Sequence, residues 1–296
     1  GIQKSGGKAF NFSKEYIISC VEGSLQRLKT DSVDFLLLHR PDTLMEPEEV
    51  AEAFDSLSFS GKVKYFGVSN QNPMQIELLN KYLSKLEHKY TFEKLEKSKV
   101  FRDPLYGNII VEYKLLWDLI DTREVQRLRR IRQLSGVSMV FFSVEHSRFG
   151  HALGTYYIAY RMCNEVTDLK KQLSEYEKIV FLAAALLHDV GHGPYSHAFE
   201  HVFGLKHEII TCQMIEDENT EINKVLSKYP FLANDIAGII RHDGKYPLIE
   251  SLITSQLDVD RLDYLNRDAH FTGATYGVVD VDRLIRIMRV VDGQIC

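Results

Sequence analysis

The sequence predicts a chain of two parts, an incomplete α/β unit followed by a mostly α-helical unit. Helical and strand patterns alternate as far as residue 86, with turn residues between them. A charge-rich stretch of weak periodicity, Lys85–Lys99, comes next and reads as a solvated linker or helix end. We place the domain boundary there, between units over residues 1–87 and 88–296. From Val100 onward the apolar spacing is mostly that of helices.

The α/β unit has a simple order of elements. The predicted segments are a helix over 14–29, a strand over 33–38, a helix over 46–57, a turn and strand over 61–70, and a helix over 73–86. This alternation is typical of a parallel α/β barrel. Only two of the eight strands that such a barrel requires can be recognised, so we expect an incomplete barrel with unpaired strand edges.

Composition is that of an ordinary globular protein: 45% of the 296 residues are hydrophobic, 26% are charged, and the net charge is −5. A weakly acidic chain has no overall field to attract nucleic acid or an anionic membrane, and we expect neither partner. The longest apolar runs, Val137–Val144 and Ile179–Leu187, are too short for a membrane span. Four scattered cysteines favour a reducing, cytoplasmic compartment. The chain stops soon after a helical pattern, and we expect a truncated C-terminus.

The stretch Leu186–Glu200 carries the densest group of chemically active residues. It holds His188, Asp189, His192, His197 and Glu200. An apolar helical run, Ile179–Leu187, leads into it, and buried imidazoles and carboxylates need partners. The simplest partner for both is a divalent metal ion. A new helix near Pro194 places His197 and Glu200 on one face, where a carboxylate can raise the basicity of an imidazole and fix its orientation.

Two upstream segments add basic and imidazole groups. An arginine-rich helix is predicted over Arg123–Leu134. It is either a solvated face or a surface that binds nucleotide phosphate. Further on, Arg148 lies between His146 and His151 at the entrance of a helix that runs to about Leu169.

A third helix is predicted over Ser255–Asp268. Arg261, Tyr264 and Asp268 share one of its faces and could offer a guanidinium, a phenol and a carboxylate to one ligand. Asp260 lies beside that face and could be a second carboxylate ligand for a metal. A salt-bridged surface helix is the alternative interpretation.

The first unit resembles the aldo-keto reductase family over roughly residues 11–86. The motifs that carry the resemblance are Ser-Leu-x-Arg-Leu-x-x-Asp-x-Val-Asp, Leu-Leu-His-Arg-Pro-Asp and Gly-Lys-Val-x-x-Phe-Gly-Val-Ser-Asn. The resemblance implies that His39 assists carbonyl reduction and that Ser69 and Asn70 contact the nicotinamide. The catalytic tyrosine, lysine and aspartate of the family have no counterpart. We therefore interpret the unit as a leftover fragment, for which NADPH is not an expected cofactor.

The second unit resembles the HD-domain metal phosphohydrolases over roughly residues 100–291, and among them the deoxynucleoside triphosphate triphosphohydrolases. Four motifs carry this in order: Asp121–Leu134, His146–Gly154, His188–His197 and Asp258–Asp268. The resemblance implies a mostly helical fold and hydrolysis of a deoxynucleoside triphosphate to deoxynucleoside and triphosphate. It also implies assembly into a homo-oligomer.

The same resemblance implies a role for each matched residue. A divalent ion (Mg, Mn, Fe or Zn) would be held by His151, His188, Asp189 and Asp260. His197 and Glu200 would form the acid/base pair, and His192 and His207 would line the phosphate site. Phosphate would also be contacted by Arg148 and Arg261. The deoxyribose would be contacted by Gln133, Leu134, Tyr264 and Asp268.

The implied chemistry suits these residue types. A divalent ion polarises a phosphoryl oxygen and positions water for attack at the α-phosphorus, while an imidazole–carboxylate pair transfers the proton. Three alternatives are another HD nucleotidase or cyclic-nucleotide phosphodiesterase, an NADPH-linked reductase, and an inactive truncated fusion that binds metal or nucleotide. The predicted sugar-binding set Gln133, Tyr264 and Asp268 favours the triphosphohydrolase.

Overall fold

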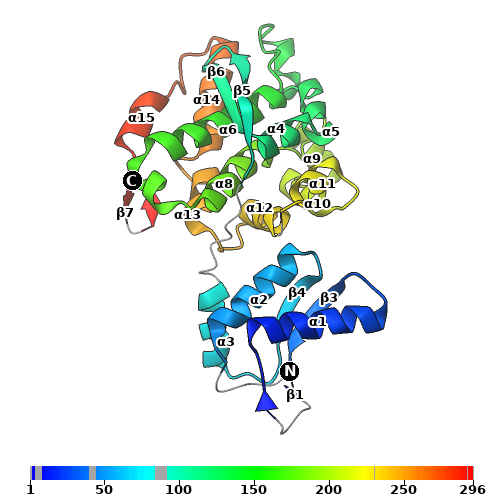
Figure 1. The fold of residues 1–296 in the computed structure, drawn as a ribbon. Helices are drawn as coiled ribbons and strands as arrows, with labels where there is room; N and C mark the ends of the chain where they lie inside the picture. The colour runs from blue at the N-terminus through cyan, green and yellow to red at the C-terminus, as the bar shows by residue number, and fades with distance from the viewer. Residues whose placement is uncertain are drawn as a thin grey trace. The chain divides into compact units, whose positions relative to one another are not determined.

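The computed structural model describes residues 2–3, 9–39, 45–83, 92–229, 231–291 and 293–295 (Figure 1). The chain divides into two compact units, Gly1–Lys89 and Tyr90–Cys296, and each has its own hydrophobic core. The domain boundary predicted near residue 88 lies outside the described residues. The predicted fold class, a mostly helical unit preceded by an incomplete α/β unit, is confirmed.

The first unit contains the predicted order of helices and strands. Its elements are β1 (Ile2–Gln3), β2 (Ala9–Phe10), α1 (Lys14–Leu28), β3 (Val33–Leu38), α2 (Pro47–Phe59), β4 (Val63–Val68) and α3 (Pro73–Leu83). β3 and β4 form a two-stranded parallel sheet in which Leu36 lies opposite Phe66. The core forms where α1 and α2 cover one face of this sheet, with Val21, Phe54 and Val63 buried.

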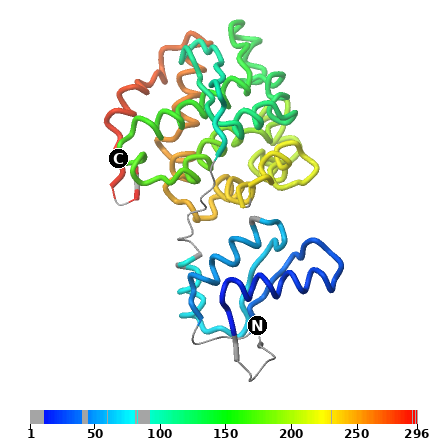
Figure 2. Tube along the Cα trace, in the orientation of Figure 1, coloured from blue at the N-terminus to red at the C-terminus, as the bar shows by residue number. Residues whose placement is uncertain are grey.

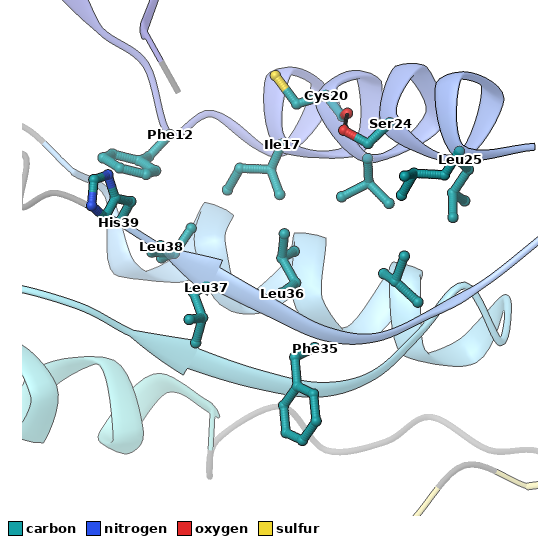
Figure 3. Close-up of a pocket in the computed structure, with 13 residues that line it drawn as sticks. Phe12, Ile17, Cys20, Ser24, Leu25, Phe35, Leu36, Leu37, Leu38 and His39 are labelled. Carbon is teal, nitrogen blue, oxygen red and sulfur yellow. Dashed lines mark hydrogen bonds between the residues drawn. The ribbon is translucent and has the colours of Figure 1, made fainter. Parts of the chain in front are cut away.

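The other face of the small sheet is open. Phe35, Leu37 and Tyr65 point away from the core and are 69%, 58% and 52% exposed. A cavity of about 370 Å³ lies between α1 and β3, and its lining is mostly aliphatic, with His39 and Phe12 at one end (Figure 3). Uncovered apolar surface is the expected result when two strands stand where a closed barrel would have eight.

The second unit is a helical bundle that begins with a hairpin. Its elements are β5 (Lys94–Asp103), β6 (Gly107–Tyr113), α4 (Lys114–Asp121), α5 (Arg123–Gln126), 3-10 turns at Arg127–Arg130 and Ser135–Met139, α6 (Arg148–Glu165), α7 (Thr167–Gln172), α8 (Glu175–Leu187), α9 (His197–Phe203), α10 (His207–Glu216), α11 (Glu221–Leu226), α12 (Leu232–Arg241), α13 (Pro247–Ile253), α14 (Val259–Thr272), α15 (Val281–Ile287), β7 (Val290–Val291) and β8 (Gln294–Ile295). Among the described helices, none is both long and apolar enough to cross a membrane.

α8 is the centre of this bundle and fixes where the histidine-rich stretch begins. Ser174 and Glu177 cap its N-terminus reciprocally, which satisfies backbone donors that the helix cannot pair. Every residue over Ile179–Leu187 has no exposed surface. α6 packs against both α8 and α14, and Figure 2 shows α6 and α8 (green) and α14 (orange) running through the unit. The ends of these three helices therefore have fixed positions.

The prediction of a solvated linker or helix end over Lys85–Lys99 is wrong for its described C-terminal part. Residues from Lys94 onward form β5, which pairs antiparallel with β6 and has a register shift between Lys94 and Lys99. Most of this part of β5 is exposed on both faces, so its sequence lacks the apolar alternation that marks a strand. Cross-strand hydrogen bonding, which is not local in sequence, decides the structure here.

The prediction of one helix over Arg123–Leu134 is also wrong. α5 ends at Gln126, a 3-10 turn continues to Arg130, and the chain is then extended. The N–H of Gln133 donates to the carbonyl of His146, and the N–H of Arg148 donates to that of Ile131. These bonds to the segment before α6 take the place of helical ones. The predicted helix after His151 is shorter too, because α6 ends at Glu165 and α7 follows.

Candidate metal centre and the neighbouring histidines

Four side chains converge where α8 ends. They are His151 from α6, His188 and Asp189 from the end of α8, and Asp260 from α14, the set predicted to hold a metal. Asp260 Oδ1 is 3.0 Å from Nε2 of His151 and 3.6 Å from Nε2 of His188. Asp189 is 3.6 Å from each of these nitrogens. Ligands about 2 Å from a common ion lie roughly 3–4 Å from one another, so the spacing suits a single divalent cation.

The imidazole nitrogens test whether a cation fits. His151 has no exposed surface, and its Nδ1 lies 2.8 Å from Asp263. Nδ1 of His188 donates to the carbonyl of Ala185. On both rings Nε2 is buried and makes no aligned hydrogen bond. A buried nitrogen without a partner is costly, and a bound cation would satisfy both rings at once. The residues present therefore fit a divalent metal ion.

Charge also favours a cation at this position. Burial lowers the pKa of His151, but the carboxylates of Asp260 and Asp263 outweigh burial and raise it to about 10. Burial raises the pKa of Asp260, yet His151 and His188 hold it well below its ordinary value. The pKa of Asp189 is likewise depressed, because His188 and Arg148 outweigh its burial. Both carboxylates are ionised at neutral pH, and a cation would displace the proton on His151.

Arg148 is buried beside the ligand set. Its guanidinium pairs with Asp189, and its Nε donates to the hydroxyl of Ser196 at 2.8 Å. Ser196 and the preceding Tyr195 have φ values of 50° and 66°, a left-handed conformation that is strained for residues other than glycine. Arg148 thus fixes one metal-ligand candidate and the turn that starts α9.

A second cluster surrounds Glu200 on α9. Its carboxylate lies 2.7 Å from Nδ1 of His207 and 3.4 Å from Nδ1 of both His197 and His192. The rings of His192 and His207 stack with centroids 3.8 Å apart. Burial lowers the pKa of His192 to about 4, so this ring is neutral at neutral pH. Burial raises the pKa of Glu200, but His207 and His197 outweigh it and the net shift is downward.

The predicted pair of His197 and Glu200 is present in this cluster, but it is not the shortest contact. His207 is the nearer imidazole, and the side chain of His197 is 70% exposed. The two clusters touch, because Nε2 of His192 lies 3.3 Å from Asp189.

Two of the residues predicted to bind the sugar, Gln133 and Asp268, contact His146. Asp268 lies 2.8 Å from Nε2 of His146, and Gln133 donates its backbone N–H to the His146 carbonyl. The side-chain oxygen of Gln133 and Nδ1 of His146 are both buried without a partner. Leu134 is half-buried next in sequence. An unpaired buried acceptor suits recognition of a ligand hydroxyl.

Two further predicted residues have looser surroundings. Arg261 is exposed, with its Nε 3.7 Å from Asp258, the residue that caps α14. Tyr264 is half-buried, and burial raises its pKa. Both are on the helix that carries Asp260, as the sequence predicts.

The structure adds residues that the sequence analysis missed. Asp263 accepts a hydrogen bond from His151 on the edge of the ring opposite the ligand set. The sequence feature that could have identified Asp263 is its position one helical turn after Asp260. Arg127 donates to the carbonyls of Val190 and His192 and so holds the turn after α8. It was visible only as one of several arginines in a basic segment.

The reductase-like positions of the first unit are also close together. Asn70 donates its side-chain N–H groups to the carbonyl of His39 at 2.9 Å and to the hydroxyl of Ser69 at 3.1 Å. His39 and Asn70 are exposed, at the ends of β3 and β4.

Comparison with known families confirms both resemblances read from the sequence. Residues 148–268 match the HD domain, and residues 3–102 match the aldo/keto reductase family. The second match ends within β5, a strand of the second unit.

Relatives and solved structures match about two thirds of this chain. An uncharacterised protein of Bacillus subtilis, YwfO, is 48% identical over 207 residues, which is 70% of this chain and 48% of that protein. The deoxynucleoside triphosphate triphosphohydrolase SAMHD1 homolog of Dictyostelium discoideum is 32% identical over 213 residues, 67% of this chain and 41% of that protein. A phosphohydrolase structure from Bacteroides thetaiotaomicron matches with a TM-score of 0.61 and 33% identity, covering 67% of this chain and 48% of that one. The chain spans about half the length of these relatives.

Proposed function

We propose, from the premise that the second unit belongs to the HD-domain phosphohydrolases, that it hydrolyses deoxynucleoside triphosphates to deoxynucleoside and triphosphate with a divalent metal ion. The observation that carries the proposal is the convergence of two buried, unpartnered imidazole nitrogens with the two carboxylates of Asp189 and Asp260. When bound, the ion supplies a Lewis acid that polarises a phosphoryl oxygen and lowers the pKa of water.

The arginine and histidines beside the ligands bind the polyphosphate. Arg148 has N–H groups left after its bonds to Asp189 and Ser196, and these can donate to phosphate oxygens. Because its low pKa keeps His192 neutral, that ring offers a hydrogen bond without adding a charge. A fixed guanidinium also offsets the charge that develops on the phosphate chain during hydrolysis.

Glu200 and its imidazoles handle the proton. Glu200 is ionised at neutral pH and orients the rings of both His207 and His197. We assign the general-acid role to His197, because it is the exposed member and can reach a leaving oxygen. His207, held more closely by Glu200, lines the phosphate site.

The sugar-binding part of the proposal rests on the region around His146, and the choice of deoxyribose rests on the similarity to a deoxynucleoside triphosphate triphosphohydrolase homolog. Asp268 is held there by His146, and Gln133 presents an unpaired acceptor oxygen. A sugar hydroxyl that donates to the side-chain oxygen of Gln133 would satisfy a buried acceptor, which favours a ligand with a hydroxyl at that position.

The test is product analysis with the full chain. We expect the protein with Mn²⁺ and each deoxynucleoside triphosphate to release inorganic triphosphate, and the His188→Ala variant to lose this release by about 100-fold or more. The matched control is His242→Ala, because His242-Asp243 repeats the same dipeptide at the end of α12, outside the proposed site. Release that survives His188→Ala refutes the site. Release of orthophosphate or pyrophosphate points to another nucleotidase activity.

A further inference from the structure

Behind His151 lies a carboxylate with no exposed surface, Asp263. Its Oδ2 is 2.8 Å from Nδ1 of His151, whereas Nε2 of the same ring faces Asp260 and Asp189. When Nδ1 carries the hydrogen that Asp263 accepts, the neutral ring must present its lone pair at Nε2. Asp263 therefore controls both the tautomer and the direction of one proposed metal ligand.

Asp263 is itself held from the β5–β6 hairpin. Arg267 donates to it through Nε at 2.9 Å and through Nη2 at 3.0 Å, and the hydroxyl of Tyr106 donates at 2.8 Å. The remaining guanidinium nitrogen, Nη1, donates to Asp103 at 2.9 Å. Asp103 also accepts the backbone N–H groups of Leu105 and Tyr106, which closes the hairpin turn. A continuous series of buried contacts runs from this turn to His151.

The charges in this series do not cancel. Asp103 and Asp263 carry two negative charges. Among the described residues, the single positive charge of Arg267 is paired with both of them. Arg267 is 2% exposed, so solvent screens these charges little. With a neutral His151, one negative charge is left over behind the ring. That charge increases the attraction of Nε2 for a cation on the other side.

The same helix that carries His151 makes room for the network. A Cβ atom on Gly154 would lie 1.8 Å from Oδ1 of Asp263 and 2.6 Å from Nη2 of Arg267. Only a glycine allows α6 to pass this close to the pair. The network therefore lies directly against the helix turn that positions the ring.

We propose that Asp103, Arg267 and Asp263 form an outer support that orients His151 and sets the metal affinity of the site, with the hairpin turn as its anchor. The inference rests on the proposed metal site and assigns a role to the Asp103–Gly107 turn, which the function above leaves without one. These residues are positioning residues, because they act through His151.

The test compares three single variants of the full chain by titration with Mn²⁺ alone. Asp263→Asn removes the charge next to His151, and Asp103→Asn removes a charge that touches none of the four proposed ligands. The matched control is Asp235→Asn. Asp235 is also buried, and it accepts from Tyr176, Tyr246 and Lys245, which are not among the proposed ligands. Thermal unfolding without metal is recorded for each variant.

We expect Mn²⁺ affinity to fall about 10- to 100-fold in Asp263→Asn, by less in Asp103→Asn, and by under about twofold in Asp235→Asn, even where Asp235→Asn unfolds at lower temperature. If Asp263→Asn does not fold, the Asp103→Asn result decides. Wild-type affinity in both network variants, or an equal loss in Asp235→Asn, overturns the inference and leaves the proposed function standing. Absence of Mn²⁺ binding by the wild type overturns both.

Nitrogen-15 NMR of the histidine rings tests the positioning role directly. A residue that only stabilised the fold would not change the signals of the metal-bound His151 ring. The protein is loaded with Zn²⁺, which is diamagnetic and leaves the ring signals observable, and we expect the wild type to show His151 with hydrogen on Nδ1. In metal-loaded Asp263→Asn the His151 signal should shift or broaden, while the His188 signal keeps its position, because His188 is held by Ala185 instead. An unchanged His151 signal contradicts the inference.

Discussion

The two units both bring polar side chains to the end of an apolar element, but with different results. In the first unit, His39, Ser69 and Asn70 meet where β3 and β4 end; the Asn70 side chain donates to the backbone carbonyl of His39 and to the hydroxyl of Ser69, and the His39 side chain is exposed. In the second unit, His151 and His188 meet where α8 ends, inside the protein, with one nitrogen of each ring unsatisfied. Proximity of these residue types is therefore common to both units, whereas among the described residues the buried imidazole nitrogens without a partner belong to the second.

The packing around each group of polar residues explains why one group is hydrated and the other is buried. α8 is enclosed on all sides, so the residues that follow it start from a buried position. β3 is enclosed on one face only, and its alternate side chains Phe35 and Leu37 are exposed. A polar group at the end of a half-covered strand remains hydrated, and water meets its hydrogen-bonding needs. The enclosed arrangement favours metal binding, because fewer water molecules can satisfy these nitrogens in place of a cation.

The largest expected effect comes from one glycine in each unit. Gly154→Ala in α6 should destabilise the second unit by about 1–3 kcal/mol, because the new methyl group collides with the buried Asp263–Arg267 pair. Gly23→Ala in α1 should stabilise the first unit by up to about 1 kcal/mol, since alanine favours a helix and the nearest atom is the flexible end of Arg27. Urea unfolding of both variants, followed in each unit, measures the two effects. If both variants were destabilised, or both were stabilised, the difference in packing between the two units would be contradicted.

An intermediate effect is expected from pH. Because the carboxylates raise the pKa of His151 to about 10 against the effect of burial, the metal-free site holds a proton there at neutral pH. A metal must displace that proton, so Mn²⁺ affinity should rise about tenfold per pH unit between about pH 6 and pH 8 for each proton released. The protonated ring also stabilises the metal-free fold, fully below about pH 6.5 and progressively less as pH approaches 10.

Titration calorimetry in two buffers of different ionisation enthalpy counts the protons released. Affinity that does not change with pH, with no proton released, would show that His151 is not a ligand. His242→Ala serves as the control here also, because its loss should leave the slope unchanged.

The smallest effect is expected at the solvated group of the first unit. His39→Ala should leave Mn²⁺ affinity and triphosphate release unchanged within about twofold, and the unfolding free energy within about 0.5 kcal/mol, because its side chain is exposed. Calorimetric titration and the product assay measure this. A tenfold loss of activity would mean that the reductase-like unit contributes to the reaction.

Local patterns were enough to predict much of the fold. The elements α1, β3, α2, β4 and α3 follow from apolar spacing, and the buried run of α8 follows from its composition. The predicted helix that carries Arg261, Tyr264 and Asp268 is present as α14, although it begins at Val259 and not at Ser255. In each case residues close in sequence determine the local structure, so the sequence pattern is enough to predict it.

The parts that local patterns missed depend on partners outside the segment itself. β5 is a strand because β6 pairs with it, and the segment after Gln126 is extended because it bonds to the residues before α6. Asp263 gains its place behind His151 only when α14 packs against α6. The preference of Glu200 for His207 over His197 depends on how α10 returns to α9, which spacing within one helix cannot show.

The contacts behind His151 also bear on the order of folding. His151 and Asp263 are 112 residues apart in sequence, and Asp103 and Arg267 are 164 apart. Closing such long loops costs chain entropy that local helix formation does not recover, so these contacts form after the helices they join. A metal ion finds no complete ligand set on a growing or partly folded chain. Metal uptake by the second unit would therefore report the completion of folding.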